Sequence, residues 1–565
     1  MRTCRKRGCF PVVCVAKPCP RHLLADGRRD HGRLPIVSKS TLLRNGTVYS
    51  PADPSATAIL VAGDRIVWVG GEAEAAARAS AADEVVDLGG ALVTPAFVDA
   101  HVHVLGTGLG QRGADIGDAR SLDEFLDRLR RHARAHPGEP IGGQGWDEHD
   151  WPERRPPIRE EIDAATEGAV VLLSRVDGHS SLISTALADR EPGITTADGY
   201  EGAIVRRQAQ TLARQAAERS IPDQTRREIH REVLYRAAGL GIGAVHEMAA
   251  PHINSEDDVR ALLELAAAEP LPEVVAYWGE AGADGVQRAQ GMGAAGAAGD
   301  LTVDGSLGSR SAGLDEPYAD DPSTSGQLYL DVEAASDHVV ACTRAGLQAG
   351  FHCIGEAAVR IAVAAIADAA RRCGEDEVVR ARHRLEHVEM ISPPLVEQMA
   401  RLGIVASVQP VFDALWGGSE GMYATRLGKR RAATLNPFAS MARAGVGLAF
   451  GSDSPVTPLG GWEAVRAAVY HHNREFRMSV RGAFQAATGG GWRAAKVQDA
   501  GTLAAGMAAT FAVWELSGGQ AAVEPVDQDA PGSRSQAVVL PDLRPGQPLP
   551  HCVRTVVRGR TVFER

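Results

Sequence analysis

The sequence predicts an α/β protein whose main body is a TIM (β/α)8 barrel, and two observations carry that prediction. Short apolar segments typical of buried strands alternate with Ala-rich segments typical of helices between residues 240 and 453. A further apolar segment, VTPAFVDAHV, precedes them and brings the number of predicted strands to eight. Eight strand–helix units suggest a closed barrel, whose active site lies at the carboxyl ends of its strands.

The predicted barrel strands are spaced as strand–helix units require. Helical segments such as Ser255–Ala268, Val359–Arg372 and Pro394–Leu402 separate most of them. The predicted strands after the first are Ile242–His246, Glu273–Trp278, Asp300–Asp304, Gln348–Cys353, Arg384–His387, Ile404–Gln409 and Gly447–Asp453.

Three other regions surround the predicted barrel, which occupies residues 94–109 and 232–500. Short β-branched runs around turn signals predict one β-sandwich built from both chain ends, in two parts, residues 39–93 and 501–565. Residues 110–231 are too long for a simple strand–helix connection, so we expect an inserted α+β subdomain over the active site. Its helical patches include Ser121–His136, its strand is residues 169–180, and a loop rich in Trp, Gly and Pro covers residues 143–157.

The first 38 residues form a basic, Pro-rich segment without periodicity, in which cysteines recur every five residues at Cys4, Cys9, Cys14 and Cys19. That spacing does not match a zinc-finger pattern. We expect a disordered tail or a start codon assigned too far upstream.

Composition narrows the function classes. The net charge is −11, the pI is about 5.9 and no basic stripe follows residue 40, which disfavours nucleic acid and anionic membranes as partners. No apolar run approaches the ~20 residues of a membrane-spanning helix. We therefore expect a cytoplasmic protein.

Polar side chains at the ends of the predicted strands point to a metal. His101 and His103 are two residues apart at the end of the first strand, so their side chains project from the same face. His352, His387 and Asp453 end or lie near the ends of later strands. Imidazole and carboxylate are the ligands that hydrolytic divalent metals use. A single histidine here is more often a hydrogen-bonded core residue, but the joint placement at one rim favours a metal site.

The order of these motifs resembles the amidohydrolase superfamily. TPAFVDAHVH, DGSLGSRSA, HCIGEAAV, RLEHVEM and FGSDSPV are similar to its amidohydrolase family 3 branch, the group of N-substituted formamide deformylases, over roughly residues 41–565. The resemblance implies a metal-dependent hydrolase that cleaves C–N bonds other than peptide bonds in a small organic substrate, and it is compatible with a homodimer.

The resemblance also implies a set of ligands. His101 and His103 match the ligands of strand 1, His352 and His387 those of strands 5 and 6, and Asp453 the aspartate of strand 8. Many members carry a carboxylated lysine on strand 4 that bridges two metals, but this chain has Asp300 at that position. Asp300 could bridge as a carboxylate or leave a single-metal site, so we expect one or two ions, zinc by preference.

Chemical roles follow from this ligand set. A bound Zn²⁺ lowers the pKa of its water from 15.7 to about 7 and polarises a carbonyl oxygen. Asp453 is the candidate catalytic base, although it could also cap a turn into a helix. Candidate substrate-binding residues are Trp146, His179, His246, Arg310 and Trp416. The structural alternatives are packing within the insertion for Trp146 and His179, support of a metal ligand for His246, and an ion pair with a carboxylate such as Asp315 for Arg310.

Two other functions remain open at the level of sequence. One is a deaminase or cyclic amidase of the same superfamily, which would use similar chemistry on another pocket. The other is a non-catalytic relative that keeps the barrel as a binding module, and measured metal content would separate it from the enzymes.

Overall fold

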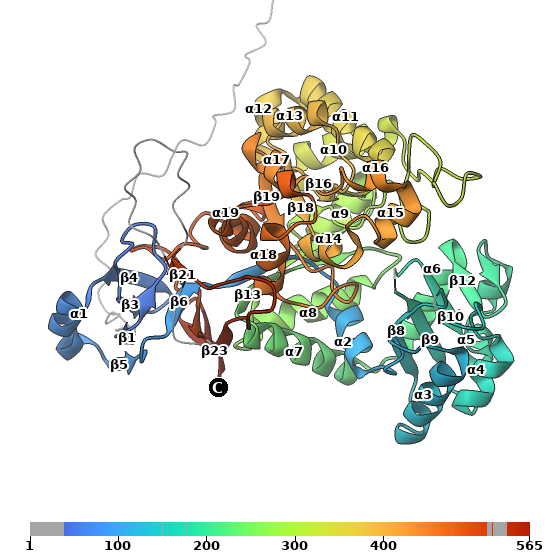
Figure 1. Ribbon diagram of the computed structural model, residues 1–565, viewed down its shortest axis with the longest axis horizontal. Coiled ribbons are helices and arrows are strands. Elements are labelled where there is room, and N and C mark those ends of the chain that lie inside the picture. The colour runs from blue at the N-terminus through green and yellow to red at the C-terminus, as the bar shows by residue number, and fades with distance from the viewer. Residues whose placement is uncertain (1–38, 150, 177, 517–521, 524–538) are drawn as a thin grey trace, which may run out of the picture. The chain divides into compact units, whose positions relative to one another are not determined.

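The predicted barrel is present as an eight-stranded parallel sheet in the computed structural model of the protein (Figure 1). The structure describes residues 39–149, 151–176, 178–516, 522–523 and 539–565, so the predicted tail 1–38 lies outside the described residues. In pairing order the strands are β7 (Phe97–Val102), β13 (Ile242–Ala249), β14 (Glu273–Trp278), β15 (Gly296–Ala297), β16 (Gln348–Cys353), β17 (Arg384–His387), β18 (Val405–Val408) and β19 (Gly447–Phe450).

The barrel closes where the loop after β19 meets β7. Val102 and Ser454 form a parallel bridge, the backbone N–H of Asp453 donates to the His101 carbonyl at 2.8 Å, and that of His103 donates to the Ser454 carbonyl at 2.9 Å. Gly451 allows this approach, because a Cβ there would lie 2.5 Å from the His101 nitrogen. The first and last strands are therefore joined at the residues that the sequence singled out.

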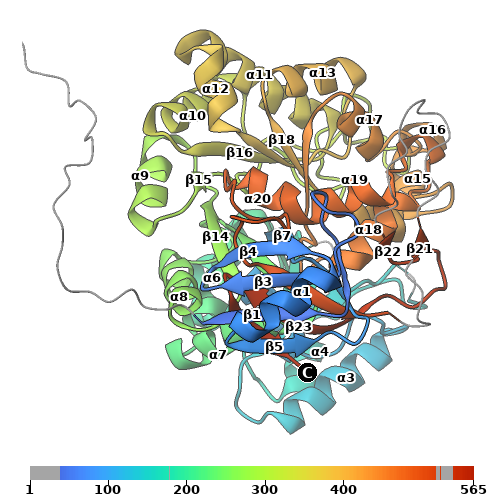
Figure 2. The same ribbon diagram turned by 90° about the vertical axis from the view of Figure 1, so that its left-hand side faces the viewer.

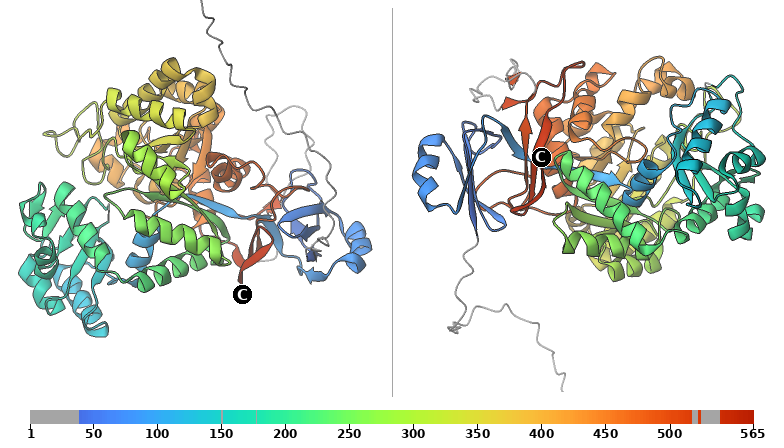
Figure 3. Two further views of the ribbon diagram at one scale, coloured as in Figure 1. Left: turned by 180° about the vertical axis from the view of Figure 1, so that it is seen from behind. Right: turned by 90° about the horizontal axis from the view of Figure 1, so that it is seen from below.

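Helices cover the outside of the sheet, and Figure 3 shows them from behind and from below. Their alanines and branched residues pack on the strands in one continuous core, with Val339, Ala362 and Ile366 fully buried. The helices that follow or flank barrel strands are α2 (Val104–Arg112), α7 (Asp223–Gly239), α8 (Glu256–Ala268), α9 (Gly282–Met292), α10 (Val332–Ala345), α11 (Glu356–Cys373), α12 (Glu375–Ala381), α13 (Pro393–Arg401), α14 (Pro410–Trp416), α15 (Met422–Leu427), α16 (Lys429–Ala432), α17 (Phe438–Arg443), α18 (Gly461–Val469), α19 (Val480–Gln485) and α20 (Gly491–Ala494).

The prediction of a strand over Asp300–Asp304 is wrong. The fourth barrel strand is β15, two residues that end before Gly299, whose φ of +82° turns the chain. Beyond that turn the segment touches the sheet through a single parallel bridge between Thr302 and His352. Asp300 therefore lies in an irregular segment that still runs along the rim of the barrel.

The insertion after β7 has its own five-stranded sheet, in the order β11-β12-β10-β9-β8. Ser121 caps its first helix by accepting from the Glu124 N–H at 3.1 Å, as the predicted helix start requires. Of the predicted strand 169–180, residues 171–175 form a strand, and an antiparallel neighbour begins only at Ser180. The predicted loop 143–157 begins within a strand. The elements are α3 (Leu122–Ala135), β8 (Ile141–Trp146), α4 (Arg159–Thr166), β9 (Val171–Arg175), β10 (Ser180–Ile183), α5 (Thr185–Arg190), β11 (Tyr200–Glu201), β12 (Ile204–Arg206) and α6 (Arg207–Arg219).

Two further sheets are drawn mainly in blue and dark red in Figure 2: one contains N-terminal strands only, and the other combines strands from both ends of the described chain. Trp514 is buried between them and the barrel, and its indole N–H donates to Thr94 at 2.8 Å. One sheet has the order β4 (Arg65–Gly70), β3 (Ala58–Ala62), β1 (Ser40–Arg44) and β5 (Glu84–Asp87), with α1 (Glu72–Arg78) beside it; the other has β2 (Thr47–Val48), β6 (Leu92–Pro95), β20 (Phe511–Glu515), β23 (His551–Val557) and β24 (Arg560–Glu564). The fold class predicted from sequence is confirmed.

None of the helices in the described ranges is long and apolar enough to span a membrane.

Candidate metal centre

Four of the predicted ligands meet at the closed rim of the barrel. The Nε2 atom of His101 lies 3.4 Å from Asp300 Oδ1 and 3.4 Å from Asp453 Oδ1. The Nε2 atom of His103 lies 3.3 Å from Asp300 Oδ2 and 3.2 Å from Asp453 Oδ1. Two imidazoles and two carboxylates, all buried or nearly so, therefore converge on one small volume.

The other two predicted ligands stand beside this group. The rings of His101 and His387 have centroids 5.0 Å apart, and those of His387 and His352 are 4.5 Å apart. Ligand atoms of His101, His387 and Asp300 all lie within 4.8 Å of one another, as do those of His101, His103 and Asp453. The two sets share His101, so the rim contains two overlapping three-ligand groups.

A buried ion pair fixes the ring of His101 from behind. Its Nδ1 atom lies 2.9 Å from Glu386 Oε2, and the Arg384 guanidinium holds the same carboxylate at 2.6 and 3.1 Å. Burial alone would raise the pKa of Glu386, but Arg384 and His101 hold that pKa down at about 2. The ionised carboxylate accepts the Nδ1–H of His101, so the lone pair on Nε2 faces Asp300 and Asp453.

Hydrogen bonds orient the later histidines as well. His387 Nδ1 lies 2.8 Å from the side-chain oxygen of Gln409, which leaves its Nε2 turned to the rim. His387 and Val388 both have left-handed backbone, with φ of 70° and 50°. A β-branched residue rarely takes that conformation, so the end of β17 holds strain at the place where His387 leaves the strand.

Asp304 anchors the segment that contains Asp300. Its carboxylate accepts the backbone N–H groups of Gly313, Ile354 and Gly355 at 2.8 to 3.0 Å. It also lies 3.6 Å from Nδ1 of His352. Because Asp304 is fully buried and bonded on several sides, it positions this loop rather than facing the rim.

One observation in particular shows that these residues suit a divalent cation. His101 Nε2 and Asp300 Oδ1 are buried, lie 3.4 Å apart and have no hydrogen-bond partner among the described residues. Buried polar atoms are normally satisfied, and a carboxylate facing an imidazole lone pair is repulsive unless positive charge lies between them. A metal ion supplies that charge, and nitrogen with oxygen donors is the set that zinc accepts.

A cavity of about 1310 Å³ opens onto this cluster. The rim contributes His103, Asp300, His352, His387 and Asp453 to its lining. The insertion contributes much of α6, and the irregular segment around residues 302–329 contributes a third wall. The volume accommodates a small organic molecule beside the buried carboxylates and imidazoles.

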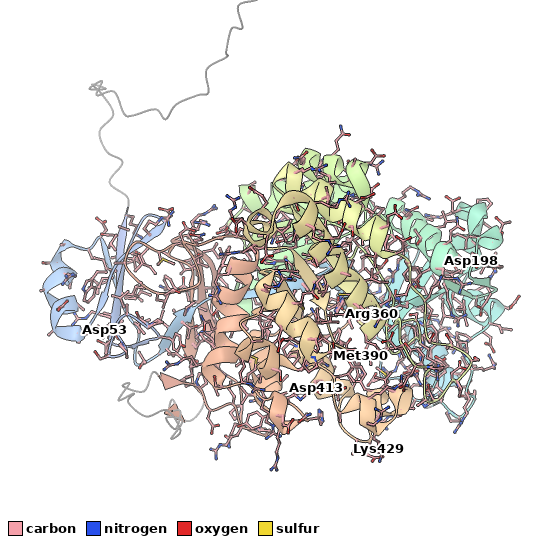
Figure 4. All side chains as sticks on the ribbon, turned by 90° about the horizontal axis from the view of Figure 1, so that it is seen from above. Asp53, Asp198, Arg360, Met390, Asp413 and Lys429 are labelled. Carbon is pink, nitrogen blue, oxygen red and sulfur yellow. The ribbon has the colours of Figure 1, made fainter. Side chains whose placement is uncertain are left out.

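Two of the predicted substrate-binding residues line the cavity. The ring centroid of His179 lies 6.3 Å from that of His352, so this residue of the insertion faces the rim. Arg310 also lines the cavity, but its guanidinium pairs with Asp320 at 2.8 Å rather than with Asp315. Asp315 instead pairs with Arg360, which Figure 4 labels on α11.

The other three predicted substrate-binding residues do not line the cavity. Trp146 is 1% exposed in the core of the insertion, and its N–H donates to the Leu173 carbonyl. Trp416 packs on Phe412 in a separate cluster, with ring centroids 4.8 Å apart. His246 is fully buried within the barrel, where its Nδ1 lies 3.2 Å from Arg384. The positions of Trp146 and His246 match the structural alternatives given for them, whereas Trp416 belongs to the Phe412 cluster and not to the cavity wall.

Several residues that the sequence did not single out support the site. Glu386 and Arg384 lie two residues apart on β17, so strand alternation places both in the barrel interior. The alternation of charged residues in the motif RLEH could have indicated this pair. Glu247, directly after His246, lines the cavity and accepts the backbone N–H of Val104 at 2.7 Å. His252, in the loop after β13, also lines the cavity.

A parallel barrel with buried imidazoles and carboxylates at one rim defines the class of metal-dependent hydrolases. Comparison with known sequences makes the assignment specific. The chain matches the amidohydrolase family over residues 84–563 and belongs to that family, in its family 3 branch.

Individual relatives agree with this assignment. The chain is 26% identical to N-substituted formamide deformylase of Arthrobacter pascens over 427 residues, which cover 71% of this chain and 77% of that protein. It is 26% identical over 473 residues to protein LONG AFTER FAR-RED 3 of Arabidopsis thaliana, covering 76% and 77%. Among solved structures, an uncharacterized metal-dependent hydrolase from Pyrococcus horikoshii superimposes with a TM-score of 0.70 at 25% identity, over 85% of this chain and 98% of that one.

Proposed function

We propose that this metal-dependent hydrolase cleaves an amide-like C–N bond, other than a peptide bond, in a small organic substrate. The observation that carries the proposal is the group of buried imidazole and carboxylate atoms that lack partners and face a cavity of about 1310 Å³. The similarity of the chain to a relative named N-substituted formamide deformylase supports the proposed type of bond.

The residues that would hold the metal are His101, His103, Asp300, His352, His387 and Asp453. A divalent ion bound there, which we propose to be zinc, supplies a water of lowered pKa and polarises the carbonyl of the substrate. One ion would satisfy either three-ligand group. A second ion would need a carboxylate such as Asp300 as a shared ligand, because the Nε2 lone pair of His101 serves one ion only.

Asp453 moves the proton in this proposal. Its carboxylate lies against His101 of β7 and His103 just beyond that strand, and it also lines the cavity, so it would reach both water and substrate from one position. Its backbone has φ of 55° and is held by the bond to the His101 carbonyl, which fixes the carboxylate relative to β7. Asp453 accepts the proton of the attacking water and returns it to the leaving nitrogen.

Substrate panels and one substitution test the proposal together. The zinc-loaded protein is assayed against formamides, N-acyl amines, ureas, hydantoins and aminated heterocycles. We expect turnover of at least one amide-type substrate, and Asp453→Asn is expected to keep bound metal while losing at least about 100-fold in kcat. Activity that survives in Asp453→Asn contradicts the assignment of the base, and turnover of aminated heterocycles alone would indicate a deaminase instead.

A further inference from the structure

The loop after β13, residues 250–254, holds a histidine that the function above does not use. It follows a buried strand at the same carboxyl-end rim as the metal cluster. His252 lies at its centre and lines the cavity together with His103, Asp300 and His352.

The backbone around His252 is fixed on both sides. The N–H groups of Ile253 and Asn254 donate to the Ala250 carbonyl at 2.8 and 3.0 Å, which makes a tight turn. The carbonyl of Pro251 accepts from Gln215 of the insertion at 2.9 Å. The Asn254 side chain is buried and donates to Asp258 at 2.8 Å.

The imidazole of His252, in contrast, has no hydrogen bond to any residue in the described ranges. Asp300, Arg214, His352 and His103 lie within electrostatic reach of the ring. Burial in the cavity wall lowers the pKa of His252 to about 4, so the ring is neutral at pH 7 and offers one N–H and one lone pair. A fixed backbone with a free ring above a reactive centre suits contact with a ligand.

We propose that His252 binds the substrate by donating a hydrogen bond to an oxygen outside the scissile bond. This proposal rests on the proposed hydrolysis, since it places the rest of the substrate between the metal cluster and α6. Arg214 of α6 donates to the Gly178 carbonyl and lines the same wall, so this end of the cavity is rich in donors. The group that fits is a carboxylate or a carbonyl on the substituent of the amide.

Kinetics of two variants test the contact. For the best substrate of the panel, His252→Ala is expected to raise KM about tenfold with little change in kcat, as loss of a binding contact does. His252→Gln, which also offers an N–H, should recover part of the affinity. Metal content should stay at the wild-type level in both variants. His551→Ala is the control, because His551 is exposed on β23, far along the chain from the cavity-lining residues.

N-formylglycine and N-ethylformamide refine the test, since they share the scissile bond and only the first carries a carboxylate. We expect the preference for N-formylglycine to fall in His252→Ala. A KM within twofold of wild type in His252→Ala, at equal metal content, overturns the proposal while leaving the proposed hydrolysis intact.

Chemical labelling gives a readout that does not need turnover. Diethyl pyrocarbonate should modify His252 in the zinc-loaded protein, as located by peptide mass spectrometry. His551 serves as the accessible control and His383 as the protected one, because His383 is fully buried and both its ring nitrogens are hydrogen-bonded. If His252 stays unmodified, its ring is not accessible in the cavity and the proposal is overturned. If His252 is labelled but the protein is inactive on the whole panel, only the proposed hydrolysis is rejected.

Discussion

At the scale of single residues, His101 is oriented by one charge and faces two others. Glu386 accepts from its Nδ1 on one side, and Asp300 and Asp453 lie 3.4 Å from its Nε2 on the other. Burial alone would raise the pKa of Asp300, but positive charge at His101 and His103, where a proton or a metal ion takes the Nε2 lone pair, holds that pKa well below the usual value. The carboxylates of this cluster therefore stay ionised and favour the binding of a cation.

Removing the charge behind His101 tests this orientation. Glu386→Gln is expected to weaken zinc binding about 10- to 100-fold, the usual effect of losing the carboxylate that supports a metal-bound histidine. It should also destabilise the fold by about 3–5 kcal/mol, because Arg384 is left as an uncompensated buried charge. Zinc affinity from competition with a chelator and the Tm measure the two effects.

The matched control for that variant is Glu84→Gln, which removes a carboxylate from an exposed pair with Lys39. Neither zinc affinity nor Tm should change in it. Zinc affinity of Glu386→Gln within twofold of wild type would show that the ion pair does not support the metal.

Asp300 gives a second prediction, because a carboxylated lysine at that position would require carbon dioxide and an aspartate does not. Protein stripped by a chelator and refilled with zinc in bicarbonate-free buffer should regain full activity. Added bicarbonate should change neither the extent nor the rate of recovery. A dependence on bicarbonate would mean that a lysine elsewhere supplies the bridge.

At this scale, the sequence locates a side chain where its chemistry and its position at a strand end agree. It does not locate a side chain whose place is decided by packing alone. His101, His103, Asp300 and Asp453 come together because each sits at or just beyond a strand end of one rim. Trp146 could not be placed from its neighbours, since an indole in a Gly-rich stretch is equally suited to a pocket or to a core. His252 was not predicted because β13 runs to Ala249, beyond the predicted end at His246, and the turn that carries His252 has no periodicity of its own.

At the scale of elements, the site depends on how closely β19 approaches β7. Their meeting point brings the loop with Asp453 against the strand with His101, and Gly451 leaves just enough room. The alternation of apolar and helical segments was enough to predict seven of the eight strands near their places. β15 could not be predicted, because a strand of two small residues, Gly296 and Ala297, carries no periodicity.

Adding a methyl group at Gly451 tests whether the close approach of β19 to β7 matters for the site. Gly451→Ala places a Cβ 2.5 Å from the His101 nitrogen, so β7 or β19 must shift, at about 1–3 kcal/mol. We expect a lower Tm and reduced zinc content. Gly447→Ala, at the start of β19, is the control, because the nearest contact of its added Cβ is an ordinary 3.7 Å to Val405. Equal zinc content in the two variants would contradict the importance of this junction.

At the scale of the whole molecule, the last strands tie the chain ends to the barrel. Thr555 of β23 donates to the Ala238 carbonyl of α7 at 2.6 Å, and β23 pairs with β20, which in turn pairs with β6. The amphipathic runs at both ends of the sequence predicted this shared sheet, although its strand order could not be read from them.

Removing residues 551–565 should therefore affect the entire protein. β20 would become an exposed edge with Trp514 uncovered, which favours aggregation. We expect the shortened chain to be recovered mainly as aggregate, as judged by size-exclusion chromatography. A monodisperse product with the Tm of the full chain would contradict this account of the sheet.

The central claim is that the buried cluster at the rim of the barrel binds a divalent metal, and metal content tests it most directly. The full chain and a His101→Asn/His103→Asn variant are stripped with a chelator, equilibrated with zinc, freed of excess and measured by inductively coupled plasma mass spectrometry. The account predicts at least about one zinc per chain in the wild type and a small fraction of that in the variant, in agreement with the use of both histidines as ligands. A wild-type chain that retains no zinc, or a variant that retains as much as the wild type, would contradict it.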